Sequence, residues 1–146
     1  MTKFLIFLIL YPPVQAKIMV TDKFLDSLEH IESGGDRYAM GDFKNGLARA
    51  VGCLQLWEIY VQEANRLQSH TTYRLIDRKY PVKSREMTRI VLSHWGQYFQ
   101  HKGIRITPAV LASLHRHPCG AWSRKEMESK HERKRTAKLL TYLKEH

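Results

Sequence analysis

Apolar residues at helical spacing are the feature that most limits how this chain can fold. The clearest stretch covers residues 82–100, where Met87, Val91, Trp95 and Tyr98 recur at intervals of about one helical turn. That spacing places them on one face of a helix, and such a face is normally buried against other parts of the chain. No segment shows the strict alternation typical of a set of half-buried strands. The sequence therefore predicts a mainly α protein.

Start and stop signals place further helices on both sides of this stretch. Thr21-Asp22 suits the start of a first helix, which Gly34-Gly35 ends. Thr107-Pro108 begins a fourth helix, and Ser123 opens a capping-box pattern that precedes a last helical region.

The region between the first helix and residue 80 is less regular. Asn45-Gly46 is a strong turn signal, so residues 36–47 are predicted to be irregular, with room for one short β-hairpin. A second helix is predicted over residues 49–67, and residues 68–80 are expected to form a loop. A chain of 146 residues is long enough for one domain with one hydrophobic core.

Residues 1–16 differ from the rest of the chain. A basic start at Lys3 is followed by an apolar run to Tyr11, by two prolines and by Val14-Gln15-Ala16. That order is typical of a secretory signal, and the apolar run is too short to span a bilayer. An N-terminal strand or a buried helix start is the alternative. We therefore expect an exported protein, periplasmic or extracellular, whose mature part is residues 17–146; an uncleaved signal would tether it to a membrane.

The formal net charge of +10 indicates an affinity for anions, and basic residues crowd the C-terminal stretch around Arg133-Lys134-Arg135. A basic surface attracts polyanions such as nucleic acid, acidic lipid or the anionic polymers of a cell envelope. The alternative is a solvated helix face, because Glu126, Glu128 and Glu132 are interspersed there. Charge alone does not select the partner.

The two cysteines, Cys53 and Cys119, suit either one disulfide or two buried thiols. Their spacing does not decide between these states. No Cys-x-x-Cys pair suggests zinc or thiol redox chemistry, so no metal or cofactor is expected.

Glu32 is the candidate catalytic residue, at the end of the first predicted helix. It lies one helical turn after Leu28, so it projects from the apolar face. The last turn also presents the negative end of the helix dipole. Burial and the dipole both disfavour a charged carboxylate there, which suits this side chain to donate a proton to a glycosidic oxygen. A peripheral glutamate near a helix end is the alternative.

Residues 38–57 add groups that suit a sugar chain. Gly52, at the predicted start of the second helix, allows a ligand to approach the backbone closely. Gln55 offers a donor and an acceptor to N-acetyl or hydroxyl groups. Tyr38 and Trp57 offer flat faces to sugar rings, although Trp57 also falls on an apolar helical stripe, where a place in the core is favoured.

Three short motifs in this region resemble a known family. The segments Ile31-Glu32-Ser33-Gly34-Gly35, Gly41-Asp42 and Ala50-Val51-Gly52, the last followed by Gln55, are similar to the lysozyme superfamily, in particular its soluble lytic transglycosylase and goose-type lysozyme branch. The resemblance covers most of residues 22–146 and is most specific over residues 31–57. It implies a lysozyme-like domain with Glu32 as the catalytic acid. Ser33 is its companion and a substrate-binding residue, and Gly52 and Gln55 belong to the substrate-binding segment.

The chain departs from this family's pattern after the fourth predicted helix. Relatives usually have an Asn there, often within His-Asn-Gly-Gly-Pro, whereas this chain has His115-Arg116-His117-Pro118. Arg116 takes the Asn position but cannot accept a hydrogen bond. Arg116 either contacts the substrate in another way than the Asn of the relatives, or it forms an ion pair with Glu32 that keeps this residue from donating a proton. His115 and His117 are candidate substrate contacts, with packing or solvated histidines favoured.

The resemblance implies cleavage of the MurNAc-GlcNAc β-1,4 bond, with peptidoglycan glycan strands as the partner. In lytic transglycosylases one glutamate protonates the leaving oxygen and then deprotonates the 6-hydroxyl, which closes a 1,6-anhydro ring. This route needs no second carboxylate, so it is favoured over hydrolysis by a lysozyme. For hydrolysis the second carboxylate would be Asp36 or Asp42, although Asp42 is expected to shape its loop.

Two further hypotheses stay open. Arg116 allows a non-catalytic glycan-binding protein of the same fold. The net charge allows a helical nucleic-acid-binding protein, which the N-terminal signal disfavours. Nucleic acid is therefore not expected as a partner, while anionic envelope polymers remain candidates.

Overall fold

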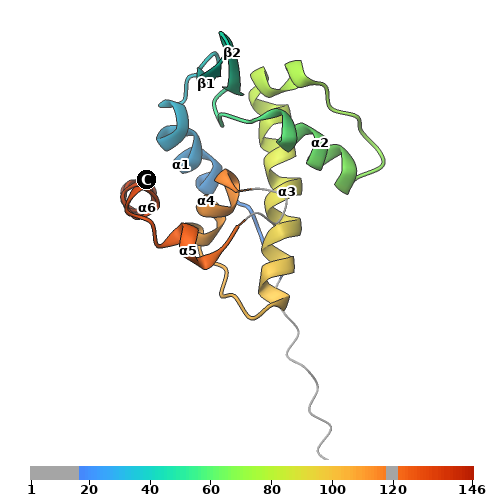
Figure 1. Cartoon of the computed structure of the whole chain (residues 1–146). Helices are drawn as coiled ribbons and strands as arrows, with labels where there is room; N and C mark the ends of the chain where they lie inside the picture. The colour runs from blue at the N-terminus through green and yellow to red at the C-terminus, as the bar shows by residue number, and fades with distance from the viewer. Residues whose placement is uncertain (1–16, 118–121) are drawn as a thin grey trace, which may run out of the picture.

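A computed structural model describes residues 17–117 and 122–146 of the chain. The fold is mainly helical with one short antiparallel hairpin, which confirms the predicted mainly α, α+β class (Figure 1). The elements in chain order are α1 (Asp22–Ser33), β1 (Met40–Lys44), β2 (Leu47–Val51), α2 (Glu58–Leu67), the 3₁₀ helix η1 (Leu75–Lys79), α3 (Pro81–His101), α4 (Pro108–Arg116), α5 (Arg124–Met127) and α6 (Lys130–Glu145).

Helix α1 begins and ends where the sequence predicts. The Thr21 hydroxyl accepts a hydrogen bond from the Phe24 amide at 3.2 Å, which caps the first turn. Gly34 ends the helix in the left-handed conformation, with φ of 67°, which a residue with a side chain adopts only at a cost. Leu25 and Leu28 are fully buried, so the helix presents its apolar face to the core and its last turn to the site described below.

The hairpin lies slightly later in the chain than predicted, and it replaces the start of the predicted second helix. Asn45 and Gly46 both have positive φ, as a two-residue hairpin turn requires, and Lys44 pairs with Leu47 on either side of them. Residues 49–51, which the apolar spacing assigned to a helix, form β2 instead. Gly52 and Gln55 both adopt positive φ. A helix cannot run through such residues, so α2 begins only at Glu58.

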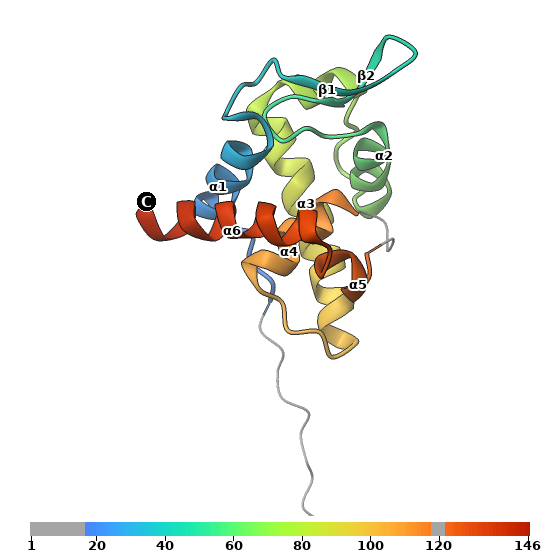
Figure 2. The same ribbon diagram turned by 60° about the vertical axis from the view of Figure 1, so that its left-hand side comes forward.

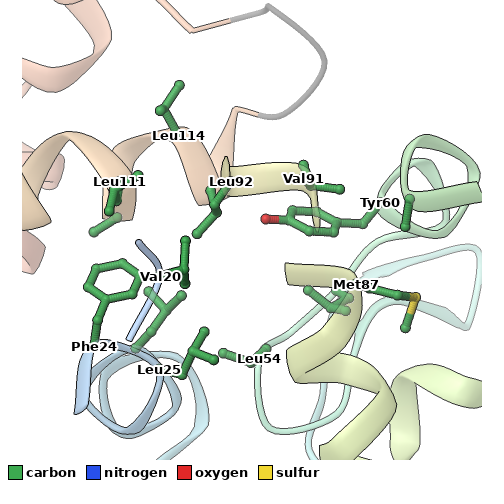
Figure 3. Close-up of a cluster of buried hydrophobic side chains, with 14 of the residues drawn as sticks. Val20, Phe24, Leu25, Leu54, Tyr60, Met87, Val91, Leu92, Leu111 and Leu114 are labelled. Carbon is green, nitrogen blue, oxygen red and sulfur yellow. The ribbon is translucent and has the colours of Figure 1, made fainter. Parts of the chain in front are cut away.

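Helix α3 forms the centre of the molecule, as Figure 1 shows, with α1 and α2 on either side of it. It begins at Pro81, whose fixed φ suits a first helical turn. Met87, Val91 and Leu92 are fully buried and meet side chains from α1, α2 and α4 in one cluster (Figure 3). Burial of such side chains is the main force that holds this fold together. The helix predicted over residues 82–100 is therefore confirmed.

The C-terminal part of the chain is helical, and its last helix, α6, packs against α1. Thr107 caps α4, as predicted, by accepting from the Val110 amide at 3.3 Å. The predicted last helical region is two helices: the short α5, and then α6, which Ser129 caps through the Glu132 amide. Figure 2 shows α6 lying across α1 and α4. The position of α6 decides what surrounds Glu32.

Two of the sequence predictions fall partly or wholly outside the described residues: the signal segment 1–16 and Cys119. Over the part of the chain that the structure describes, no helix has the length and apolarity needed to cross a membrane.

Cys53 is a buried free thiol that donates to a Glu29 carboxylate oxygen at 3.2 Å. Burial and then the Glu29 carboxylate raise the pKa of this thiol to about 12, so it is protonated and unreactive at neutral pH.

Candidate functional site

Two adjacent hollows meet at the C-terminal ends of α1 and α4. The first, which we call the Trp57 cleft, has a volume of about 260 Å³. It is lined by Glu32, Asp42, Ala50, Gln55, Trp57, Ile59, Tyr60, His115 and Arg116. The second, which we call the basic hollow, measures about 390 Å³ and is lined by Ile31, Glu32, Arg116, His131, Lys134, Arg135 and Lys138. Glu32 and Arg116 line both, so they stand at the boundary between an aromatic hollow and a cationic one.

The Glu32 carboxylate is largely buried and forms an ion pair with Arg135 of α6. The exposed fractions of the two side chains are 13% and 7%. A largely buried ion pair of this kind is strongly held, because separating it would leave one charge without its partner in a poorly solvated place. Glu32 is thus a fixed carboxylate that borders both hollows.

Arg135 also ties the site to α4 and to a second buried carboxylate. Its guanidinium donates to the Ala112 carbonyl at 2.9 Å and to Glu132 at 3.5 Å. Among the described residues its Nε finds no acceptor, although it is buried. Arg135 is therefore the structural link between Glu32 and the C-terminal half of the site.

Arg116 borders Glu32 but has other partners. Its Nε lies 3.3 Å from the buried Glu132 carboxylate, and another guanidinium nitrogen lies 2.9 Å from the His131 ring. The sequence raised the prospect that Arg116 pairs with Glu32. An arginine does pair with Glu32, but it is Arg135, nineteen positions further along the chain, and not Arg116. Arg116 keeps a side chain that is 40% exposed and available to both hollows.

Gln55 lines the Trp57 cleft, as predicted for a substrate-binding residue, but the donor half of its side-chain amide is bound within the protein. Its amide nitrogen donates to the Ala39 and Gly52 carbonyls at 3.1 and 2.9 Å. Both N–H groups are therefore engaged, and the side-chain carbonyl oxygen is left as an acceptor. A Cβ on Gly41 would lie 2.6 Å from this oxygen, so the glycine at position 41 leaves room for it.

Trp57 lines the cleft as well, and its expected place in the core is wrong. The side chain is 41% exposed, because α2 begins after it and the predicted apolar stripe does not extend that far back. The Arg49 guanidinium lies over the ring, 4.4 Å from its centre. Arg49 also donates to the Asp42 carboxylate at 2.8 Å, so it holds Asp42 and Trp57 together at one wall of the cleft.

Three of the predicted substrate contacts lie outside both hollows. The Ser33 hydroxyl donates to the Cys53 carbonyl at 2.7 Å, so it fastens the end of α1 to the loop after β2. Tyr38 is 64% exposed and stacks under Arg37 instead of lining the cleft. Gly52 does allow a close backbone approach, but what approaches is the Arg78 carbonyl of η1. The contacts of Ser33 and Gly52 thus hold the loop after β2 in place.

His115 is a packing residue at the floor of the cleft. Its Nε2 lies 2.9 Å from the Leu54 carbonyl and must donate to it, because a carbonyl only accepts. Its Nδ1 then accepts from the Tyr60 hydroxyl at 3.0 Å. Burial lowers the pKa of the imidazole to about 4, against a raising effect of the Glu32 charge. Both ring nitrogens are thus used inside the protein, so neither is left to hydrogen-bond a ligand.

Arg78 and Arg135 are residues whose roles the sequence did not reveal. Arg78 donates to the Arg49 and Leu56 carbonyls, each at 3.0 Å, and so holds both ends of the loop that carries Gln55. Nothing in a basic run such as residues 133–135 distinguishes the one arginine that turns inward.

Within the described ranges, no three His, Cys, Asp or Glu side chains come together in an arrangement that would hold a metal ion.

Comparisons of this chain with protein-family models, with characterised proteins and with solved structures find no match.

Proposed function

We propose that this protein is an exported enzyme that cleaves peptidoglycan glycan strands at the MurNAc-GlcNAc β-1,4 bond, with Glu32 as acid and then as base. The observation that carries the proposal is the position of Glu32. It is a largely buried carboxylate at the edge of a cleft that also presents the Trp57 ring and the Gln55 carbonyl. An aromatic face, an amide acceptor and a carboxyl group are the groups that sugar recognition and glycosidic cleavage need.

In the proposed reaction, Glu32 donates a proton to the bridging oxygen as the bond to the anomeric carbon breaks. The N-acetyl oxygen of the muramyl sugar stabilises that carbon. The Glu32 carboxylate then takes the proton of the 6-hydroxyl, whose oxygen attacks the anomeric carbon and closes a 1,6-anhydro ring. No water is consumed, and Glu32 ends in the protonated state in which it began, so one carboxyl group serves both steps.

Arg135 acts in opposite ways on the two steps. It stabilises the Glu32 carboxylate that forms when the first proton leaves. Before that step it occupies the carboxylate oxygen that has to reach the substrate. The ion pair must therefore open for Glu32 to act as the acid, and it re-forms as the glycosidic bond breaks.

Hydrolysis, as in a lysozyme, is the second candidate, and Asp42 favours it. This carboxylate lines the same cleft as Glu32 and can orient a water on the other side of the sugar. Its ion pair with Arg49 is half exposed, with side-chain fractions of 42% and 38%, so it is weaker than the pair at Glu32. The Glu32–Arg135 pair itself favours a third candidate, a glycan-binding protein without catalysis.

Clearing of purified cell walls by Glu32→Gln tests catalysis. The glutamine keeps the size of the side chain but cannot give or take the proton. The proposal expects wild-type protein to clear the walls and the variant to fail, with an unchanged circular dichroism spectrum. Equal clearing by the two proteins would refute Glu32 as the acid. Wall co-sedimentation without any release of soluble fragments by the wild type would instead support the glycan-binding candidate.

A further inference from the structure

The basic hollow is formed by one face of α6. His131, Lys134, Arg135 and Lys138 occur at the spacing that places residues on one side of a helix, and all four line the hollow. The face meets the last turns of α1 and α4, which contribute Glu32 and Arg116. Helix C-termini carry partial negative charge, which helps to hold cationic side chains nearby.

Two of these cations, Lys134 and Lys138, have no carboxylate partner among the described side chains. Glu132 is used by Arg116 and Arg135, and Glu32 by Arg135. Among the side chains that the structure describes, which exclude those of residues 118–121, 124 and 126, neither Lys134 nor Lys138 has a carboxylate within ion-pair distance. The hollow therefore has a surplus of positive charge in a recess, where charge acts more strongly than on an open surface.

Arg135 also lines this recess, and its side chain carries an unused donor. Its side chain is 7% exposed, yet its Nε is buried without an acceptor among the described residues. A buried donor without a partner is unfavourable, so an acceptor placed beside it would be stabilising. This donor is independent of the lysines and belongs to the side chain that holds Glu32.

We propose that the basic hollow is a binding subsite for a carboxylate carried by the glycan strand, with Lys134, Lys138 and Arg135 as its donors. The inference rests on the proposed function and adds that the preferred substrate is anionic. Because Glu32 and Arg116 line both hollows, a strand with a sugar against Trp57 places a neighbouring substituent in the basic hollow. The carboxylate then shares Arg135 with Glu32 and loosens the ion pair that must open for Glu32 to act as the acid. Anionic strands are thus both preferred and better cleaved.

The double variant Lys134→Gln/Lys138→Gln tests the subsite, and Lys130→Gln/Lys144→Gln is its matched control. The control removes two exposed lysines from the same helix, outside the hollow, for the same change in net charge. Binding to insoluble peptidoglycan is measured by co-sedimentation in the cold, with the peptidoglycan carboxylates either free or converted to methylamides. We expect the wild type and the control to bind the free form about tenfold more tightly than the methylamide form, because amidation removes the charge-assisted contacts. The Lys134/Lys138 variant should bind both forms alike.

A titration with inorganic phosphate, followed by amide NMR, locates the site without a substrate that turns over. Shifts confined to α6 and the ends of α1 and α4, absent from the Lys134/Lys138 variant, support the subsite. Equal phosphate binding by the two double variants overturns it. So does equal binding of free and amidated peptidoglycan by the wild type. Binding of duplex DNA that depends on Lys134 and Lys138, without binding of peptidoglycan, would assign the hollow to nucleic acid instead.

The two proposals fail in different ways. Peptidoglycan binding that depends on Lys134 and Lys138, without cleavage by the wild type, would refute the catalytic function and leave the subsite standing. Cleavage of free and amidated peptidoglycan at the same rate by both double variants would refute the subsite and leave the catalytic function standing.

Discussion

Arg135 of α6 forms an ion pair with Glu32 of α1, across 103 positions of sequence. The pair joins the last helix to the end of the first and places a cation on the one carboxylate that borders both hollows. It makes α6 part of the site. Stability and the proposed chemistry therefore depend on the same contact.

Replacement of Arg135 by glutamine should destabilise the fold strongly. The substitution leaves the buried Glu132 carboxylate and the largely buried Glu32 carboxylate without a cation they now contact. Breaking a buried pair in this way lowers the free energy of unfolding by about 3–5 kcal/mol. Urea denaturation measures the loss. Arg133→Gln is the control, because Arg133 is exposed and its loss should change stability by no more than about 0.5 kcal/mol. Equal effects of the two variants would show that the Arg135 pairs do not hold α6.

Alanine at Gly52 should be far more damaging than alanine at Gly46. Both glycines have positive φ, of 83° and 76°, so both substitutions carry a backbone cost of about 1–2 kcal/mol. Only at Gly52 would the new Cβ also overlap the Arg78 carbonyl, whereas Gly46 faces open space. We expect Gly52→Ala to lower the midpoint of chemical denaturation well beyond Gly46→Ala. Matching midpoints would mean that η1 does not pack against this loop as described.

His115 should make stability depend on pH between about 7 and 5. Its pKa is about 4 in the folded protein, below its ordinary value of 6.5, because the ring is buried. The unfolded chain therefore binds a proton at a higher pH than the folded protein does, and stability falls as pH falls through this range. From pH 7 to pH 5 the loss from this one group is about 2 kcal/mol. Urea denaturation of wild type and His115→Gln at both pH values checks it: the variant should lose this part of the dependence. The same pH dependence in both proteins would contradict the assignment.

Trp57→Ala should weaken glycan binding with little effect on the fold. The ring is 41% exposed and lines the cleft, so its loss removes a sugar-stacking face but little core contact. We expect binding of soluble glycan strands to weaken by about three- to tenfold. Tyr38→Ala is the matched control, since that ring is 64% exposed and lies outside the cleft. A larger effect at Tyr38 would move the binding surface to the loop before β1.

The helix ends that the sequence predicted were those with a local chemical cause. The Thr21 and Thr107 caps and the Gly34 stop depend on hydrogen bonds and backbone angles within a few residues, and all three occur as predicted. Residues 49–57 were assigned wrongly because their apolar spacing fits a helix as well as it fits β2 and a tight loop. Gln55 has a positive φ, which such a residue usually avoids, and its side chain is held there by hydrogen bonds to the Ala39 and Gly52 carbonyls.

The site was predicted in part, for the same reason. Glu32 and Gln55 were found because they belong to a short motif, and both line the cleft. Ser33 and Gly52 lie outside both hollows, and the groups they contact, the Cys53 and Arg78 carbonyls, are brought there by folding. Arg135 was missed because only the packing of α6 on α1 separates it from the other arginines of its run.

The most direct test of the proposed function is the mass of the fragments released from purified peptidoglycan. Wild-type protein and Glu32→Gln are incubated with the same insoluble substrate, and the soluble products are identified by mass spectrometry. The proposed mechanism predicts 1,6-anhydro fragments from the wild type, each lighter than a hydrolysis product by one water, and none from the variant. Hydrated fragments from the wild type would contradict the transglycosylase mechanism. Fragments from Glu32→Gln in equal amount would contradict the assignment of Glu32 itself.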